Sequence, residues 1–274
     1  LAVGDVEVGR LDGHDVAHAV HSPDDPKGNK VSSNNLYLLC LHTTLLCNLG
    51  VVQGDGRHGH EMPVFRKRIA QWLPRRRAGR AGQAPIFVGD PAYVDNAFWT
   101  RMELDDDRAR FITRTKANMK PIIYSADHWN QADPVNEGVL ADLLVGFDGA
   151  VTMHLIRYRD PETGADYEFL TNVKDLEPGL IGLLYLARWR IEKVFDTTKN
   201  KLEETKSWAV GKVAQEVRAH MVALTHKLLV LLRRDLEVGH GVREEKVERK
   251  REQQLVQRAT QAKAAGRKVA AVEK

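Results

Sequence analysis

The sequence predicts an α/β fold, a mixed sheet flanked by helices with an antiparallel β insertion before the helix of residues 179–203. Three observations predict it. A short apolar run at residues 85–90 ends in Asp90, as a buried strand of an α/β sheet does at its carboxyl edge. Short alternating stretches between Pro, Gly, Asp and Asn turns fill residues 108–172 and favour antiparallel strands. Helical periodicity returns at residues 179–203 and resumes at residues 211–236.

The elements before the apolar run alternate strand and helix patterns. Residues 3–20 combine alternating apolar residues with Asp-containing turns and predict one or two strands. Residues 36–52 are apolar and β-branched and predict one or two buried strands, although their periodicity leaves a helix open. Residues 64–73 predict a basic amphipathic helix that ends before Pro74.

Two further helices are predicted to cover the sheet. Residues 95–104 form a helix that directs three side chains toward the sheet: Phe98, Trp99 and Met102. The helix of residues 211–236 is predicted to direct an apolar row into the core: Val213, Val217, Met221, Leu224, Leu228 and Leu231.

The patterns divide the chain into four parts. We expect residues 1–106 to form the first part of the core and residues 107–175 to form the β-rich insertion. Residues 176–238 form the helical remainder of that core, and residues 239–274 form a basic helical tail.

Composition excludes several classes of protein. Hydrophobic residues make up 43% and charged residues 28% of the 274 residues, as in soluble globular proteins. No apolar run reaches the roughly 18 residues of a membrane span, and two cysteines form no disulfide scaffold, which suits a reducing cytoplasm. The absence of a Gly-rich phosphate loop excludes a nucleotide hydrolase of that type. The net charge is +4, and residues 241–274 hold ten Lys or Arg against five Asp or Glu, but charge alone does not establish DNA binding.

The helical segment at residues 185–199 carries the most informative side chains. At 100° per residue, one stripe about 60° wide contains four polar positions: Tyr185, Arg188, Glu192 and Lys199. The neighbouring arc is apolar, so the stripe lies at the edge of a buried face. An ordinary amphipathic helix with an Arg188–Glu192 pair at i,i+4 is the plain structural interpretation.

The spacing Tyr, two residues, Arg, three residues, Glu, six residues, Lys resembles the signature of bacterial insertion-sequence transposases of the DDE type. The segments at residues 160–164, 169–172 and 175–176 are similar to that family as well. The resemblance covers about residues 85–235 and is much weaker before residue 80.

The resemblance implies a ribonuclease H-like fold and a catalytic site of three carboxylates. Glu192 matches the signature Glu, and Asp90-Pro91-Ala92-Tyr93 resembles the Asp-x-x-Tyr of the family. Asp12, in Leu11-Asp12-Gly13-His14, resembles the family's Asp-Gly after a strand. The three carboxylates would hold Mg²⁺, with Mn²⁺ as a substitute, and Tyr185, Arg188 and Lys199 would contact the DNA backbone.

The implied activity is cleavage of DNA at the ends of an insertion sequence followed by strand transfer to target DNA. The implied partner is double-stranded DNA, bound by a homodimer in the bacterial cytoplasm at the nucleoid. Transposases of this type usually carry an N-terminal domain for the transposon end, which this sequence lacks. The alternative is therefore a truncated, inactive remnant that only folds or binds DNA.

Three alternative interpretations of the site residues remain open. Asp5 or Asp15 stands as an alternative first carboxylate, and Asp90 as a helix cap without catalytic role. A zinc site is the third: His14 and His18 at i,i+4, or the cluster His58, His60 and Glu61. The first pair needs a helix where a strand is predicted, and the second cluster lies in a Gly-rich loop.

Overall fold

The computed structural model describes these residues: 8–18, 21–22, 25–30, 33–52, 61–77, 84–104, 109–147, 152–201, 206–207 and 212–240. The chain divides into two compact units, residues 1–227 and residues 228–274. Apart from its first two residues, the predicted basic tail lies outside the described part of the chain.

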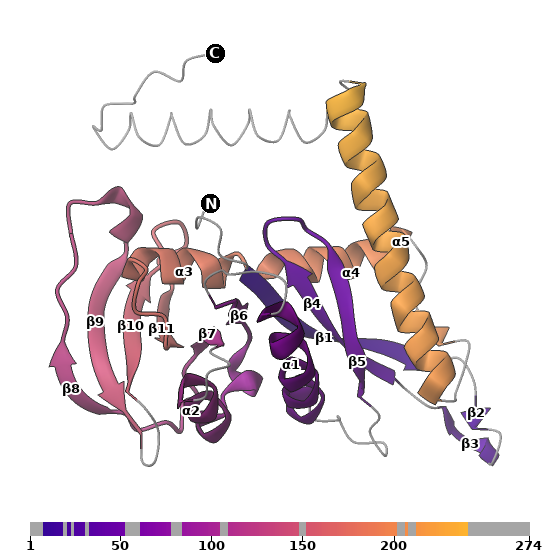
Figure 1. Cartoon of the computed structure of the whole chain (residues 1–274), viewed down its shortest axis with the longest axis horizontal. Helices are drawn as coiled ribbons and strands as arrows, with labels where there is room; N and C mark the ends of the chain where they lie inside the picture. The colour runs from indigo at the N-terminus through magenta and orange to yellow at the C-terminus, as the bar shows by residue number, and fades with distance from the viewer. Residues whose placement is uncertain are drawn as a thin grey trace. The chain divides into compact units, whose positions relative to one another are not determined.

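One mixed sheet dominates the first unit (Figure 1). Its strands are β1 (Val8–His18), β4 (Ser33–Cys40), β5 (Leu46–Val52), β6 (Ile86–Val88), β7 (Arg110–Arg114), β8 (Ile122–Ala126), β9 (Val139–Gly146), β10 (Met153–Arg159), β11 (Asp166–Thr171) and β12 (Lys206–Ser207). The order is β5-β4-β1-β6-β7-β11-β10-β9-β8, and β12 pairs with β1. β2 (His21–Ser22) and β3 (Asp25–Lys30) form a separate pair.

The direction of the strands changes along the sheet. β1 runs antiparallel to β4 but parallel to β6, and β6 runs parallel to β7. From β7 to β8 each pairing is antiparallel. The antiparallel strands β8–β11 therefore extend the same sheet that β1 and β6 begin.

The central strands are buried on both sides because helices cover both faces of the sheet. The helices are α1 (Glu61–Arg77), α2 (Asn96–Leu104), α3 (Pro178–Leu186), α4 (Trp189–Lys201) and α5 (Lys212–Gly239), with the short 3₁₀ helices η1 (Pro91–Tyr93) and η2 (Pro134–Asn136). Phe87 of β6 packs in a core with residues of α1 and α2. Its neighbours Ile86 and Val88 pack on the other side with residues of α3. Each such buried side chain contributes about 1.5–3 kcal/mol.

The predicted α/β fold class is confirmed, a mixed sheet flanked by helices with antiparallel strands before α4. Two strands, β4 and β5, occupy the segment at residues 36–52 for which a helix was left open. α2 buries Phe98, Trp99 and Met102 as expected. No helix in the described residues is long and apolar enough to cross a membrane.

Two predicted helix boundaries are wrong. α1 continues through Pro74 to Arg77, since the fixed φ of proline is compatible with helical backbone even where it removes a hydrogen bond. The helix predicted from residue 179 to 203 is broken between α3 and α4. Near the break, the N–H groups of Arg188 and Arg190 bond to carbonyls three residues back, Tyr185 and Ala187, which tightens the chain into a turn.

The predicted core face of α5 is also wrong for the part of the helix up to residue 227, which belongs to the first unit. Four of them are exposed, between 44% and 75%: Val213, Val217, Met221 and Leu224. Ala219 and Ala223 pack against β4 and β5 instead, where their small side chains permit close approach of the helix. His226 on the same face lies 3.0 Å from the carbonyl oxygen of Thr44.

Candidate active site

Asp12 lies on β1, and Asp90 lies two residues beyond the end of the neighbouring parallel strand β6. β1 pairs with β6 through Arg10 and Val88, and two residues further along the chain in each case stand Asp12 and Asp90. Neighbouring strands are about 4.8 Å apart, so the register brings these two residues level with each other. Asp12 points to the side of the sheet that α4 covers, because its carboxylate accepts a hydrogen bond from Arg188.

Gly89 separates Asp90 from the end of β6, and Asp90 is half-buried. Its Oδ1 accepts a hydrogen bond from the backbone N–H of Ala92 at 2.7 Å and caps η1. Its own carbonyl oxygen accepts from the hydroxyl of Thr113 at 2.8 Å. The capping role that rivalled a catalytic one is therefore present, and it engages Oδ1.

Arg188 joins two of the predicted carboxylates. Its Nη1 donates to Oδ2 of Asp12 at 3.1 Å, and its Nη2 donates to Oε1 of Glu192 at 3.2 Å. The turn between α3 and α4 supplies Arg188, and the first turn of α4 supplies Glu192. Burial opposes the charge of Arg188, but Asp12, Tyr185, Glu192 and Asp90 outweigh it and raise the pKa of Arg188.

The carboxylates outnumber the cations around Asp12. Burial is the largest cause that raises the pKa of Asp12 to about 7, and the charge of Arg188 opposes it. The neighbouring charges of Asp90, Glu61 and Glu192 raise it further. Asp90 and Glu192 therefore both lie close enough to act on the charge of Asp12, and a fourth carboxylate joins them.

That fourth carboxylate, Glu61, was not assigned to this site from the sequence. It begins α1, where Nδ2 of Asn34 donates to its Oε1 at 3.1 Å and the hydroxyl of Tyr93 donates to its Oε2. A Cβ on Gly13 would overlap the Glu61 carboxylate, which shows how closely Glu61 approaches the backbone beside Asp12. The sequence places Glu61 in the loop before the helix predicted at residues 64–73, whereas α1 already begins at Glu61, and no local pattern shows that this helix begins next to β1.

The predicted DNA-contacting residues differ in their surroundings. Tyr185 is 5% exposed and packs its ring 4.8 Å from that of Phe169. Burial raises its pKa, while the charges of Arg188 and Arg114 oppose the increase. The side chain of Lys199 lies outside the described residues.

The three predicted carboxylates do not converge tightly. The carboxylate oxygens of Asp12, Asp90 and Glu192 do not all lie within 4.8 Å of one another. Among the described residues, Asp127, Asp142 and His154 do form such a group. The guanidinium of Arg188 bridges Asp12 and Glu192, with one nitrogen bound to each.

The rival assignments fare differently. His14 is buried on β1 and stacks on Phe195 at 4.6 Å, in a strand as the sequence predicts. Asp5, His58 and His60 lie outside the described residues, as do the side chains of Asp15 and His18.

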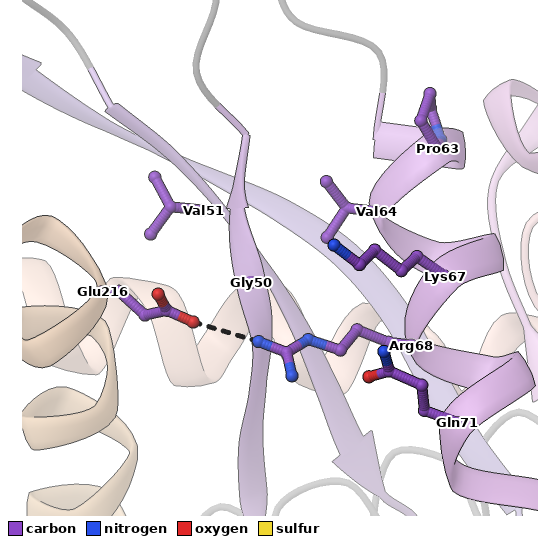
Figure 2. Close-up of a pocket in the computed structure, with 8 residues that line it drawn as sticks. All are labelled: Gly50, Val51, Pro63, Val64, Lys67, Arg68, Gln71 and Glu216. Carbon is purple, nitrogen blue, oxygen red and sulfur yellow. Dashed lines mark hydrogen bonds and ion pairs between the residues drawn. The ribbon is translucent and has the colours of Figure 1, made fainter. Parts of the chain in front are cut away.

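A cavity of about 450 Å³ lies between β5, α1 and α5 (Figure 2). Arg68 and Glu216 face each other across it with an ion pair of 3.0 Å, and Lys67 also lines it. None of the three predicted carboxylates lines this cavity, so it is separate from the candidate active site.

Comparison with solved structures gives only weak similarities. A piggyBac transposase, solved as a synaptic complex with hairpin DNA, has 8% identity and a TM-score of 0.45 over 81% of this chain and 46% of that chain. The chain thus spans about half the length of that transposase. Endonuclease V of Bacillus subtilis has 11% identity and a TM-score of 0.30 over 70% of this chain and 83% of that chain. The catalytic domain of human endonuclease V has 10% identity and a TM-score of 0.35 over 74% and 86%.

Sequence comparison gives the firmer result. No curated protein matches the chain significantly. The family described as "Transposase DDE domain" matches residues 8–228, which include Asp12, Asp90, Arg188 and Glu192. This match covers well over half of the chain, and the chain belongs to the transposase DDE domain family.

Proposed function

We propose that the chain is the catalytic domain of a bacterial insertion-sequence transposase that cuts DNA at the transposon ends and transfers the freed strand to target DNA. The observation that carries the proposal is the joint contact of Arg188 with Asp12 and Glu192, beside Asp90, within a DDE domain. The Tyr-Arg-Glu-Lys spacing supports the assignment to insertion sequences.

The donor set suits hard divalent cations. Asp12, Asp90 and Glu192 offer only carboxylate oxygens, which Mg²⁺ and Mn²⁺ prefer. Burial is the main cause of the raised pKa of Asp12, and the charges of Asp90, Glu61 and Glu192 add to it. When bound there, a metal pair would activate the attacking oxygen and stabilise the leaving oxygen of the phosphodiester.

The protein's own residues would position the DNA. Arg188 forms ion pairs with both Asp12 and Glu192. We expect it to release at least one of these carboxylates when that carboxylate binds a metal ion. A released guanidinium is suited to bind a phosphate oxygen of the DNA backbone. Tyr185 and Lys199 are assigned the same role, although Tyr185 also packs in the core.

Double-stranded DNA is the proposed partner, bound as transposon end and as target by a homodimer. The bacterial cytoplasm is the proposed location. The two contacts of Arg188, one with Asp12 on β1 and one with Glu192 four residues further along the chain, favour an intact site over a decayed remnant.

Substitution of Glu192 tests the proposal. Glu192→Gln keeps the size of the side chain and removes its charge, so we expect cleavage of DNA carrying the repeats that flank the coding sequence to fall by about 10³-fold or more, an electrostatic effect of the usual size for such sites. Asp196→Asn is the matched control, because Asp196 is exposed on the same helix one turn away. A Glu192→Gln variant as active as the control would refute the assignment.

A further inference from the structure

A second cluster of metal-ligand side chains lies on the antiparallel part of the sheet. Asp142 is on β9, His154 is on β10, and Asp127 directly follows β8. Their ligand atoms all lie within 4.8 Å of one another. β7 and β11 separate β10 from β6, the strand that precedes Asp90 (Figure 1). The cluster is thus distinct from the candidate active site.

Strand register brings the three side chains together. The N–H of Asp127 donates to the carbonyl oxygen of Asp142 at 2.8 Å, so the two aspartates stand opposite each other on antiparallel strands. His154 pairs with Leu144, and residues two apart on a strand share a face, so its ring reaches Asp142 diagonally. Like charges directly opposite each other are destabilising, which makes a cation between the aspartates favourable.

The distances suit a small coordination shell. Nδ1 of His154 lies 2.9 Å from Oδ1 of Asp142 and 3.7 Å from Oδ2 of Asp127. Ligands of a tetrahedral Zn²⁺ with ordinary bond lengths are about 3.3 Å apart, midway between these values. The side chains of His154 and Asp142 are 13% and 12% exposed, whereas that of Asp127 is 42% exposed. The cluster therefore has a closed inner side and an open outer side.

The charges also match a dication. Two carboxylates and a neutral imidazole carry a charge that one divalent ion balances. The pKa of His154 is raised, mainly by its hydrogen bond to Asp142 and also by the charges of Asp142 and Asp127. Burial and the charge of Lys174 oppose this increase. A proton on the imidazole is hence the natural competitor of a metal ion.

We propose that Asp127, Asp142 and His154 bind one transition-metal dication of the Zn²⁺ type. A mixed set of one imidazole nitrogen and two carboxylates favours such an ion over Mg²⁺ or Ca²⁺, which prefer oxygen ligands alone. Bound there, the ion fastens the edge strand β8 to β9 and β10. Such a link would stabilise β8, because all five of its residues are exposed and burial contributes little to its stability. The site is independent of the proposed transposase activity.

Zinc titration of the full chain tests the site. We expect the wild type to bind one more Zn²⁺ per chain than His154→Gln in isothermal titration calorimetry, or to bind that ion about a hundredfold more tightly. His128→Ala is the matched control, since His128 is exposed in the segment after β8 and is not part of the cluster. It should bind zinc like the wild type. Equal stoichiometry and affinity in the wild type and His154→Gln would overturn the proposal, since zinc bound elsewhere on the chain is common to both.

Hydrogen exchange gives a second readout that does not depend on the folding of His154→Gln. Saturating Zn²⁺ should slow exchange of the Asp127 amide and of the β8–β9 ladder in the wild type. Asp127→Asn, at the most exposed of the three positions, should lose this protection. Unchanged exchange in the zinc-saturated wild type, or equal protection in Asp127→Asn, would contradict the proposal.

Discussion

At the scale of single residues, Arg188 is the centre of charge balance in the candidate site. It bonds to Asp12 and Glu192, and its side chain is only 12% exposed. A guanidinium presents a fixed fork of donors that suits two carboxylates or one phosphate equally well. The same residue can therefore serve the isolated protein as an ion-pair partner and the DNA complex as a phosphate ligand.

Arg188→Ala should weaken binding of transposon-end DNA and reduce the slope of log affinity against log salt by about 1, because one phosphate contact is lost. Fluorescence anisotropy at several salt concentrations measures both quantities. Arg159→Ala is the control, since Arg159 also forms an ion pair, with the exposed Asp166, but on the β10–β11 hairpin. A binding loss with an unchanged slope would assign Arg188 a purely structural role.

The buried carboxylate of Asp12 is expected to lower the stability of the folded protein at neutral and alkaline pH. Its pKa of about 7 in the folded protein lies above the ordinary value, so the folded state binds more protons between about pH 4 and 7 and loses stability as the pH rises through this interval. In EDTA at pH 8, Asp12→Asn should therefore stabilise the protein, by on the order of 2–4 kcal/mol.

The gain from Asp12→Asn should shrink as the pH falls to 5, where the Asp12 carboxyl is already protonated. Thermal unfolding at both pH values measures it, with the exposed Asp196→Asn as the control. A variant less stable than the wild type at pH 8 would mean that the ion pair with Arg188 dominates over burial.

At the scale of elements, the sequence predicted well what hydrophobic periodicity determines. The apolar run before Asp90, the helix that buries Trp99 and the alternating strands of residues 108–172 follow directly from local patterns. The break at Ala187 and Arg188 could not be predicted, because no Pro or Gly marks it. It depends on tertiary packing, and it changes the angular positions that a single helix would give to Tyr185 and Glu192.

α5 shows the same limit in its packing face. Its larger apolar residues suggested the core side, but Ala219 and Ala223 face β4 and β5. Ala223→Leu should therefore overpack this contact and cost about 1–3 kcal/mol. Val217→Ala, on the exposed face, should change stability by no more than about 0.5 kcal/mol. Denaturant unfolding measures both, and a neutral Ala223→Leu beside a destabilising Val217→Ala would contradict this orientation.

At the scale of the whole molecule, strand order rather than sequence distance assembles the candidate site. Asp12 and Asp90 are far apart in the chain, but Asp12 lies on β1 and Asp90 follows the neighbouring strand β6, and α4 brings Glu192 to the Arg188 that also binds Asp12. The resemblance to DDE transposases predicted these partners. The cluster of Asp127, Asp142 and His154 was not predicted as a site, and Glu61 was considered only as a zinc ligand with His58 and His60. The neighbours of these residues come from pairings that no local pattern specifies.

The central claim is that Asp12, Asp90 and Glu192 together hold the catalytic metal ions. The most direct measurement is an anomalous difference map from a crystal of the full chain grown with Mn²⁺. We predict Mn²⁺ peaks bonded to oxygens of all three carboxylates, with Arg188 released from at least one of its two partners. A map in which Arg188 still bridges Asp12 and Glu192, with no Mn²⁺ at any of the three carboxylates, would contradict the account.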